Sequence, residues 1–156
     1  PTDRMDDPHG SLSSLLGMSY LIDTNAISEL ARARPDRRVT EWFDHVEPES
    51  LHISVLTLGE LRKSVESLPA GARKNRIGSW LETELPAWFE DRVLPIDAGV
   101  ADVWGRLLGR IGRPVAAIDS LIAATALRHR FRIVTRNVED FRFPGLEAVN
   151  PWQADD

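Results

Sequence analysis

The sequence contains no cysteine. A chain without cysteine has no disulfide framework, no thiolate metal site such as a zinc finger, and no cysteine nucleophile. This absence suits a reducing compartment, and we expect the protein to be cytoplasmic. Long apolar runs are also missing, because no stretch approaches the roughly 18 residues that a membrane span requires. We therefore expect no membrane partner.

Lysine is scarce among the basic residues. Only two of the 19 basic side chains are lysines, and the basic residues cluster at positions 32–38, 73–76 and 128–142. The net charge of −5 argues against a surface that binds nucleic acid over a broad area. Arginine is the better bidentate ligand for phosphate, so these clusters leave local RNA contact open. The alternative is that most of these arginines are solvated surface residues.

The length and composition fit one domain. A chain of 156 residues, with 42% hydrophobic and 28% charged residues, is long enough to bury a substantial core. Residues 1–17 are polar, rich in serine and aperiodic, and they lack the basic start and apolar stretch of a signal peptide. We expect them to be a disordered N-terminal extension or a cloning remnant, followed by a single domain over residues 18–153.

Strand and helix signals alternate along the chain. Short apolar runs predict strands at residues 20–23, 51–54, 93–96, 132–135 and 146–149. Helical periodicity predicts helices at residues 24–30, 37–46, 57–68, 100–111 and 117–129. Another amphipathic segment reaches residue 89, and Pro86 should kink or end it. Thr24-Asn25, Thr57 and Asp97 are the expected helix caps. The alternation predicts an α/β fold with a mostly parallel sheet covered by helices on both faces.

Four carboxylates lie where these apolar elements begin or end: Asp23, Glu60, Asp119 and Asp140. Each also has an ordinary structural explanation. Asp119 and Glu60 are expected in first helical turns, where the helix dipole favours an acid, and Asp23 is placed to cap a turn. If the four converge at the carboxyl ends of parallel strands, their repulsion requires a divalent cation with oxygen ligands, Mg²⁺ or Mn²⁺. Such a site is suited to phosphodiester hydrolysis.

The sequence offers no comparable reaction centre. The four histidines have no metal-ligand spacing, the glycines form no phosphate-binding loop, and no serine lies in a nucleophile elbow. The acidic residues are therefore the leading candidates for chemistry.

Four segments resemble the motifs of PIN-domain ribonucleases, particularly the VapC-type toxins and their FitB-like relatives. Residues 21–30 (LIDTNAISEL) resemble the opening motif, residues 58–62 (LGELR) the second, residues 117–126 (AIDSLIAATA) the third and residues 135–141 (TRNVEDF) the fourth. Residues 150–152 (NPW) match a common tail, and the third motif is the most specific. The motifs follow the family order, so the resemblance covers nearly all of the expected domain.

The resemblance implies a PIN-like α/β/α sandwich with about five strands and a Mg²⁺- or Mn²⁺-dependent endoribonuclease. It makes Asp23, Glu60 and Asp119 metal-binding, catalytic residues. Many relatives carry an aspartate directly after the Thr-Arg pair, where this chain has Asn137. Either Asn137 or Asp140 then completes the site, and we rank Asp140 higher because a carboxylate is the stronger ligand.

Three further residues are expected to support the site: Asn25, Thr135 and Arg136. Thr135 is placed to orient Asp23 or a bound water. For Arg136 two roles remain open, a contact with a substrate phosphate or a salt bridge to an acid of the site.

The resemblance also implies protein partners. VapC-type toxins form homodimers and assemble with a small antitoxin into heterotetramers or larger complexes. We predict antitoxin contacts at residues 29–33 and 42–46. The aromatic residues Trp42, Phe43, Trp80, Trp88 and Phe89 belong either to the core or to such an interface.

Other functions fit the sequence less well. A haloacid-dehalogenase phosphatase needs an acid two residues after its first aspartate, where this chain has Asn25. A receiver-type phosphoacceptor needs a lysine after the strand that ends at Thr135, and no lysine follows it. A more serious alternative is a catalytically weakened PIN-fold module that only binds an antitoxin or RNA, because Asn137 departs from the family pattern.

Overall fold

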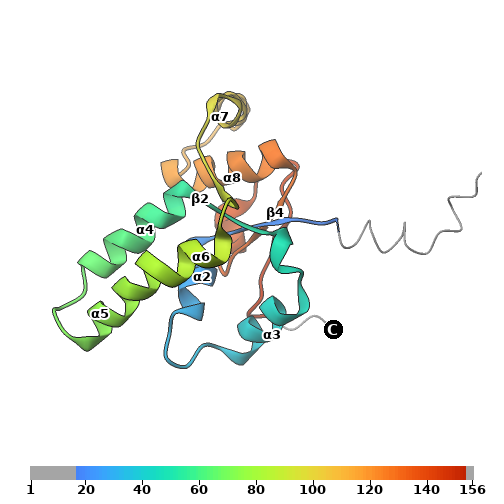
Figure 1. Cartoon of the computed structure of the whole chain (residues 1–156). Coiled ribbons are helices and arrows are strands. Elements are labelled where there is room, and N and C mark those ends of the chain that lie inside the picture. The colour runs from blue at the N-terminus through green and yellow to red at the C-terminus, as the bar shows by residue number, and fades with distance from the viewer. Residues whose placement is uncertain (1–16, 154–156) are drawn as a thin grey trace, which may run out of the picture.

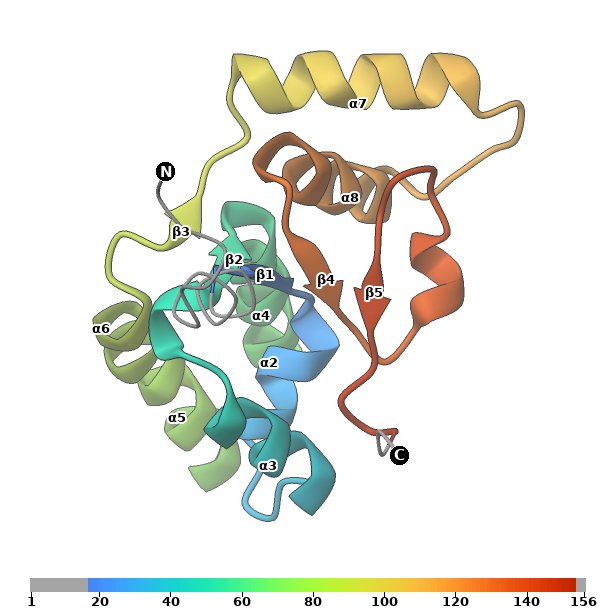
Figure 2. The ribbon, with the colours of Figure 1, turned by 90° about the vertical axis from the view of Figure 1, so that its right-hand side faces the viewer.

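A computed structural model describes residues 17–153, and the expected extension at residues 1–17 lies, apart from Gly17, outside the described residues. Five parallel strands form one sheet in the order β3-β2-β1-β4-β5. Figure 1 shows the whole chain, with β2 and β4 labelled, and Figure 2 labels all five strands. The strands are β1 (Tyr20–Ile22), β2 (Leu51–Ser54), β3 (Val93–Leu94), β4 (Arg132–Val134) and β5 (Ala148–Val149). The predicted parallel sheet of about five strands is confirmed, although four of the strands are one or two residues shorter than expected.

The central strand is β1. Its Tyr20 is in register with Leu51 of β2 and with Arg132 of β4. The chain proceeds from β1 outward to β2 and β3, then returns to the other side of β1 for β4 and β5. The strand order therefore reverses between β1 and β4, and ligands of open parallel sheets bind at the carboxyl ends of strands at such a point.

Helices cover both faces of the sheet (Figure 2). One side carries α2 (Thr24–Leu30), α3 (Arg37–His45), α4 (Val55–Glu66), α5 (Ala72–Ser79) and α6 (Leu85–Phe89). The other side carries α8 (Ala117–His129), with α7 (Ala98–Arg110) packed on it. Successive residues of β1 point to opposite faces of the sheet. Ile22 packs in the core under α2 to α6, and Leu21 packs in the core under α8. Short 3₁₀ turns, η2 (Pro48–Ser50) and η4 (Val138–Phe141), complete the fold.

Two helices are capped by other residues than the sequence predicts, and one of them, α4, begins two residues early. Asp23 itself caps α2, in place of the expected Thr24-Asn25, by accepting a hydrogen bond from the Thr24 amide at 2.9 Å. Ser54 caps α4 through the Leu56 amide at 3.0 Å, and the expected cap Thr57 is buried inside the helix. The reason is that β2 continues into α4 without a loop. Glu60 consequently lies in the second turn of α4, where the helix dipole favours an acid less.

The other predicted helices are present, although α7 begins two residues before the expected residue 100, and the structure adds one detail at Pro86. Asp97 caps α7 by accepting from the Val100 amide at 2.9 Å, and α8 has the predicted bounds. Before Pro86 the chain forms a wide π turn, η3 (Trp80–Glu84), in which the Leu85 amide bonds to the Trp80 carbonyl. This turn accommodates a proline that has no amide hydrogen and would clash with the carbonyl four residues earlier.

No helix within residues 17–153 combines the length and the apolar character needed to cross a bilayer.

Candidate active site

Asp23 lies at the carboxyl end of β1, at the point where the strand order reverses. Its side chain is buried, and its two oxygens accept hydrogen bonds from the Thr24 amide at 2.9 Å and the Thr135 hydroxyl at 2.8 Å. Burial raises the pKa of Asp23 to about 6, against the lowering effect of these hydrogen bonds, and the charges of Asp119 and Glu60 raise it further. Each carboxylate oxygen has two lone pairs, and each accepts one of these hydrogen bonds, so each keeps one lone pair for a cation.

Thr135 joins the ends of β1 and β4. Its buried hydroxyl donates to Asp23 and accepts from the Asn137 amide at 3.1 Å and the Asn25 side chain at 3.4 Å. The side-chain oxygen Oδ1 of Asn25 in turn accepts a hydrogen bond from the Arg136 backbone amide at 3.1 Å. Asn25 and Thr135 therefore hold the two strand ends together, consistent with the supporting roles predicted for them.

Glu60 reaches the site from α4. Its carboxylate accepts a hydrogen bond from the Thr24 hydroxyl at 2.5 Å, which ties the start of α2 to the second turn of α4. The sequence predicts only a capping role for Thr24. Its contact with Glu60 spans 36 positions of the chain, and no local pattern of the sequence indicates such a pairing.

Asp119 and Asp140 belong to elements on the other side of the sheet, α8 and η4. Asp119 lies in the first turn of α8, and burial, then Asp140, then Glu60 raise its pKa. Asp140 is exposed on η4, which packs against α8. Asn137 is also exposed, carries no charge, and places its backbone amide on Thr135. Asp140 therefore acts on the charge of Asp119, and the choice between Asp140 and Asn137 as the fourth site residue stays a prediction.

The four predicted acids form one electrostatic group. Asp23 and Asp119 both have raised pKa values, each is raised further by neighbouring acids, and no basic residue contributes to either shift. Within residues 17–153, no three acidic or histidine side chains come close enough to form a ready-made ion cage. The donor chemistry nevertheless fits Mg²⁺ or Mn²⁺, which prefer carboxylate oxygens, and Mg²⁺ usually keeps several water ligands.

Arg136 is fixed beside this group. Its backbone carbonyl accepts from the Asn150 side chain at 3.3 Å, and its guanidinium lies 5.0 Å from the centre of the Trp152 ring. Asn150 also accepts from the Trp152 amide at 2.9 Å. Among the described residues Arg136 forms no ion pair, so the predicted alternative of a salt bridge to an acid of the site is wrong.

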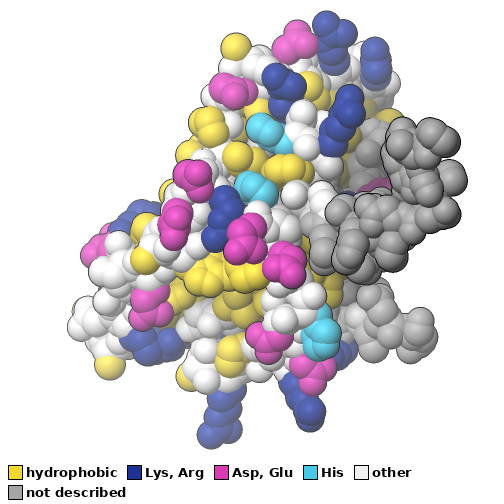
Figure 3. Space-filling view, turned by 45° about the vertical axis from the view of Figure 1, so that its right-hand side comes forward, with side chains coloured by type: hydrophobic (Ala, Val, Ile, Leu, Met, Phe, Trp, Pro, Cys, Tyr) yellow, Lys and Arg dark blue, Asp and Glu magenta, His cyan; other side chains and the backbone are white. Residues whose placement is uncertain are grey.

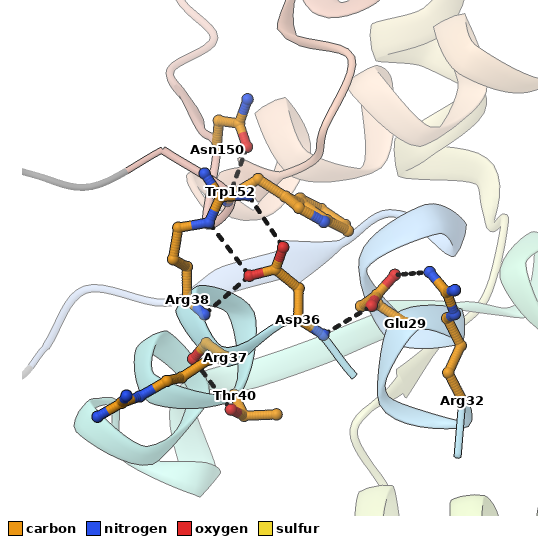
Figure 4. A network of polar contacts seen from close by, with 8 residues as sticks. All are labelled: Glu29, Arg32, Asp36, Arg37, Arg38, Thr40, Asn150 and Trp152. Carbon is orange, nitrogen blue, oxygen red and sulfur yellow. Dashed lines mark hydrogen bonds and ion pairs between the residues drawn. The ribbon is translucent and has the colours of Figure 1, made fainter. Parts of the chain in front are cut away.

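In the neighbouring network of Figure 4, each of the two acids has an arginine partner. Asp36 caps α3 and pairs with the Arg38 guanidinium at 2.9 Å. This hydrogen-bonded pair lowers the pKa of Asp36 to about 2, with a smaller contribution from the charge of Arg136. Glu29, buried at the end of α2, accepts from the Asp36 amide at 2.8 Å and from Arg32 at 3.3 Å. Arg38 is therefore ion-paired with Asp36, whereas Arg136 has no ion pair with an acid among residues 17–153.

Comparisons with known proteins agree with this architecture. The model of the PIN domain matches residues 20–143. The chain is 38% identical to VapC ribonuclease Y4jK of Sinorhizobium fredii, over 85% of this chain and 97% of that protein. It is 36% identical to Toxin FitB of Neisseria gonorrhoeae, again over 85% and 97%. The crystal structure of FitAcB from the same species superposes with a TM-score of 0.80 at 36% identity, covering 86% of this chain and 99% of that one.

Proposed function

The chain belongs to the PIN-domain family, and on this premise we propose that it is a VapC-type toxin, a Mg²⁺- or Mn²⁺-dependent endoribonuclease of a toxin–antitoxin pair, acting in the cytoplasm. The observation that carries the proposal is the group of Asp23, Glu60, Asp119 and Asp140 at the carboxyl edge of the sheet. Neighbouring acids raise the pKa of both Asp23 and Asp119, so a divalent cation is the natural complement of this negative charge.

Each acid has a distinct proposed role. Asp23 and Asp119 hold the cation, and Asp140 adds charge beside Asp119. Glu60, oriented by Thr24, binds through water or positions the attacking water. A bound divalent ion lowers the pKa of a coordinated water and neutralises a phosphate oxygen. The water would attack phosphorus in line and lose a proton as the new P–O bond forms. The bond to the leaving ribose oxygen would break, and that oxygen would take up a proton from solvent.

Arg136 is the proposed phosphate ligand at the edge of this group. Its guanidinium has no acidic partner among residues 17–153, and Trp152 holds it in place. A preorganised guanidinium loses little entropy when it binds a phosphate bidentately.

A cleavage assay tests the proposed function. The purified protein should cut single-stranded or loop RNA in the presence of Mn²⁺ or Mg²⁺. Chelation should stop cleavage, and added Mn²⁺ should restore it, because the acids alone repel both one another and the phosphate. Cleavage that persists in excess chelator would overturn the metal-dependent mechanism, and no cleavage of any RNA would overturn the nuclease itself.

Substitutions distinguish the contributions of Asp140 and Asn137 to RNA cleavage. Asp140→Asn should lower kcat/KM for RNA by about tenfold to a hundredfold, since a supporting carboxylate beside a metal ligand is typically worth that much. Asn137→Ala should lower it by less than about threefold, because the contact that the structure shows uses only its backbone amide. The reverse ranking would assign the fourth position to Asn137.

The antitoxin is proposed to bind over α2, α3 and α6. A cavity of about 420 Å³ there is lined by Leu30, Phe43, Val46 and Trp88, which includes parts of both predicted contact segments.

The aromatic residues divide between the core and this surface. Trp88 is 42% exposed, whereas Phe89 belongs to the core, and Trp42, Phe43 and Trp80 pack partly buried against the core. On the face drawn in Figure 3, apolar side chains gather in the middle with charged ones around them. Similar solved structures are of FitAB and VapBC, which supports an antitoxin partner. We further propose a homodimer that assembles with the antitoxin into a heterotetramer or larger complex.

A catalytically weakened module that only binds an antitoxin or RNA is the alternative. The separation of the acids, with no ready-made ion cage in residues 17–153, and the uncharged Asn137 favour it. Calorimetric titration with Mn²⁺ distinguishes the two, because the nuclease should take up the ion and the weakened module should not.

A further inference from the structure

A cavity of about 460 Å³ lies between α2, α4 and α5, within the size range of small-molecule sites. Figure 1 shows α4 and α5 side by side, and α2 contacts α4. The floor of the cavity is apolar and includes Leu61, Val65 and Ile77, with the partly buried Trp80 at one side. None of the residues proposed to bind the cation lines it.

The cavity begins close to two polar residues of the candidate site, Thr24 and Glu60. Ser28 and Ser64 line it, and they follow Thr24 and Glu60 by four residues on α2 and α4. Residues four apart lie on the same helix face, about 6 Å along the axis. Since the Thr24 hydroxyl bonds to Glu60, the cavity begins one helical turn beyond that bond. One nucleotide of an extended strand covers such a distance.

The rim of the cavity is positively charged. Arg32, Arg73 and Arg76 line it. Arg76 donates to the Ala31 carbonyl at 2.9 Å, and Arg32 pairs with Glu29 at 3.3 Å. Arg73 is exposed and forms no ion pair with any residue in the described part of the chain. The rim therefore offers cationic donors above an apolar floor.

We propose that this cavity binds the RNA nucleotide next to the cleaved bond, with its base against the apolar floor and its phosphate on Arg73 and Arg76. The assignment rests on the proposed nuclease function. An RNA strand whose phosphodiester reaches Asp23 and Asp119 passes over Thr24 and Glu60, so the adjacent nucleotide arrives at Ser28 and Ser64. The base stacks or packs on apolar and aromatic surface, and arginine supplies the phosphate contact. The cavity thereby contributes to the choice of cleavage position.

Two variants test this subsite by different means. Arg73→Ala removes a rim charge and should raise KM for RNA by about tenfold, the value of one charge-assisted hydrogen bond. It should also lower the slope of log K against log salt by about 0.7, as expected for one lost contact with a single strand. Ser64→Phe fills the cavity from α4 and should change which positions are cut in a mixed-sequence RNA.

The matched control is Lys74→Ala. Lys74 is adjacent to Arg73 on α5 and carries the same charge, but it faces Glu66 at 3.9 Å and does not line the cavity. It should leave KM and the cleavage positions unchanged. Thermal unfolding of each variant identifies loss of fold, and the exposed Arg73 remains decisive if Ser64→Phe is unstable.

The outcomes separate this subsite from the nuclease function. If the wild-type protein cuts RNA but Arg73→Ala matches Lys74→Ala in KM and salt slope, the nucleotide subsite is wrong and the nuclease stands. The subsite is equally wrong if Arg73→Ala changes only the binding of a protein partner. If the wild-type protein cuts no RNA, the proposed function fails first.

Discussion

Asp23→Asn and Asp119→Asn are each expected to slow RNA cleavage by at least about a thousandfold. Each substitution keeps the shape of the side chain and removes one negative charge from the acidic group. A catalytic cation supplies several kcal/mol of transition-state stabilisation, and about 1.36 kcal/mol corresponds to a tenfold change in rate. The measurement is single-turnover cleavage of one RNA at saturating Mn²⁺, so that weaker RNA binding does not obscure the chemical step.

The matched control for these variants is Asp102→Asn. Asp102 is exposed on α7, the helix that packs on α8, and it pairs with Arg106 at 2.9 Å. Its substitution changes the net charge equally and should leave cleavage within about twofold, since exposed ion pairs contribute little. Full activity in either Asp23→Asn or Asp119→Asn would remove that residue from the site.

Asp23→Asn is also expected to stabilise the metal-free protein at neutral pH. The folded pKa of Asp23 is raised from 3.8 to about 6, mainly by burial. Below pH 4 the side chain is protonated in both the folded and unfolded states, so it has no effect on stability. Between pH 4 and 6 the unfolded state ionises first, and the free energy of unfolding falls as pH rises. Above pH 6 the full cost is present, about 3 kcal/mol for a shift of about two units.

Denaturant unfolding in chelator at pH 4, 5, 6 and 7 measures this effect. At pH 7 the gain in Asp23→Asn should reach up to about 3 kcal/mol, and it should shrink towards zero near pH 4. Mn²⁺ should stabilise the wild-type protein by about 2.7 kcal/mol at a hundred times its Kd, and Asp23→Asn should lose most of that gain. A metal-free Asp23→Asn protein less stable than wild type at pH 7 would show that the hydrogen bonds from Thr24 and Thr135 outweigh the buried charge.

Much of the architecture is predictable from local patterns. Alternating apolar runs and helical periodicity predict the parallel sheet, and the predicted bounds of α8 match the structure. These features depend on residues close together in the chain, where side-chain period and capping chemistry act directly. The start of α4 is not predictable in this way, because Ser54 looks like the end of a strand and only the direct passage of β2 into a helix makes it a cap.

The candidate site shows the limits of local patterns. Asp23, Glu60 and Asp119 are identifiable from placement and from their resemblance to family motifs. The contact between Thr24 and Glu60 is not, and neither is the stacking of Arg136 on Trp152. Both join positions that become neighbours only when the helices and the C-terminal turn pack on the sheet.

The sequence by itself determined which residues carry charge and which segments are buried, because composition and periodicity set those properties before any packing. The tertiary structure alone decided which charges meet. It brought the charge of Asp140 within reach of Asp119, left Arg136 without an acidic partner among the described residues, and opened a cavity one helical turn from Thr24 and Glu60. Electrostatic coupling falls steeply with distance, so these properties depend on the folded separation of residues that are distant in sequence.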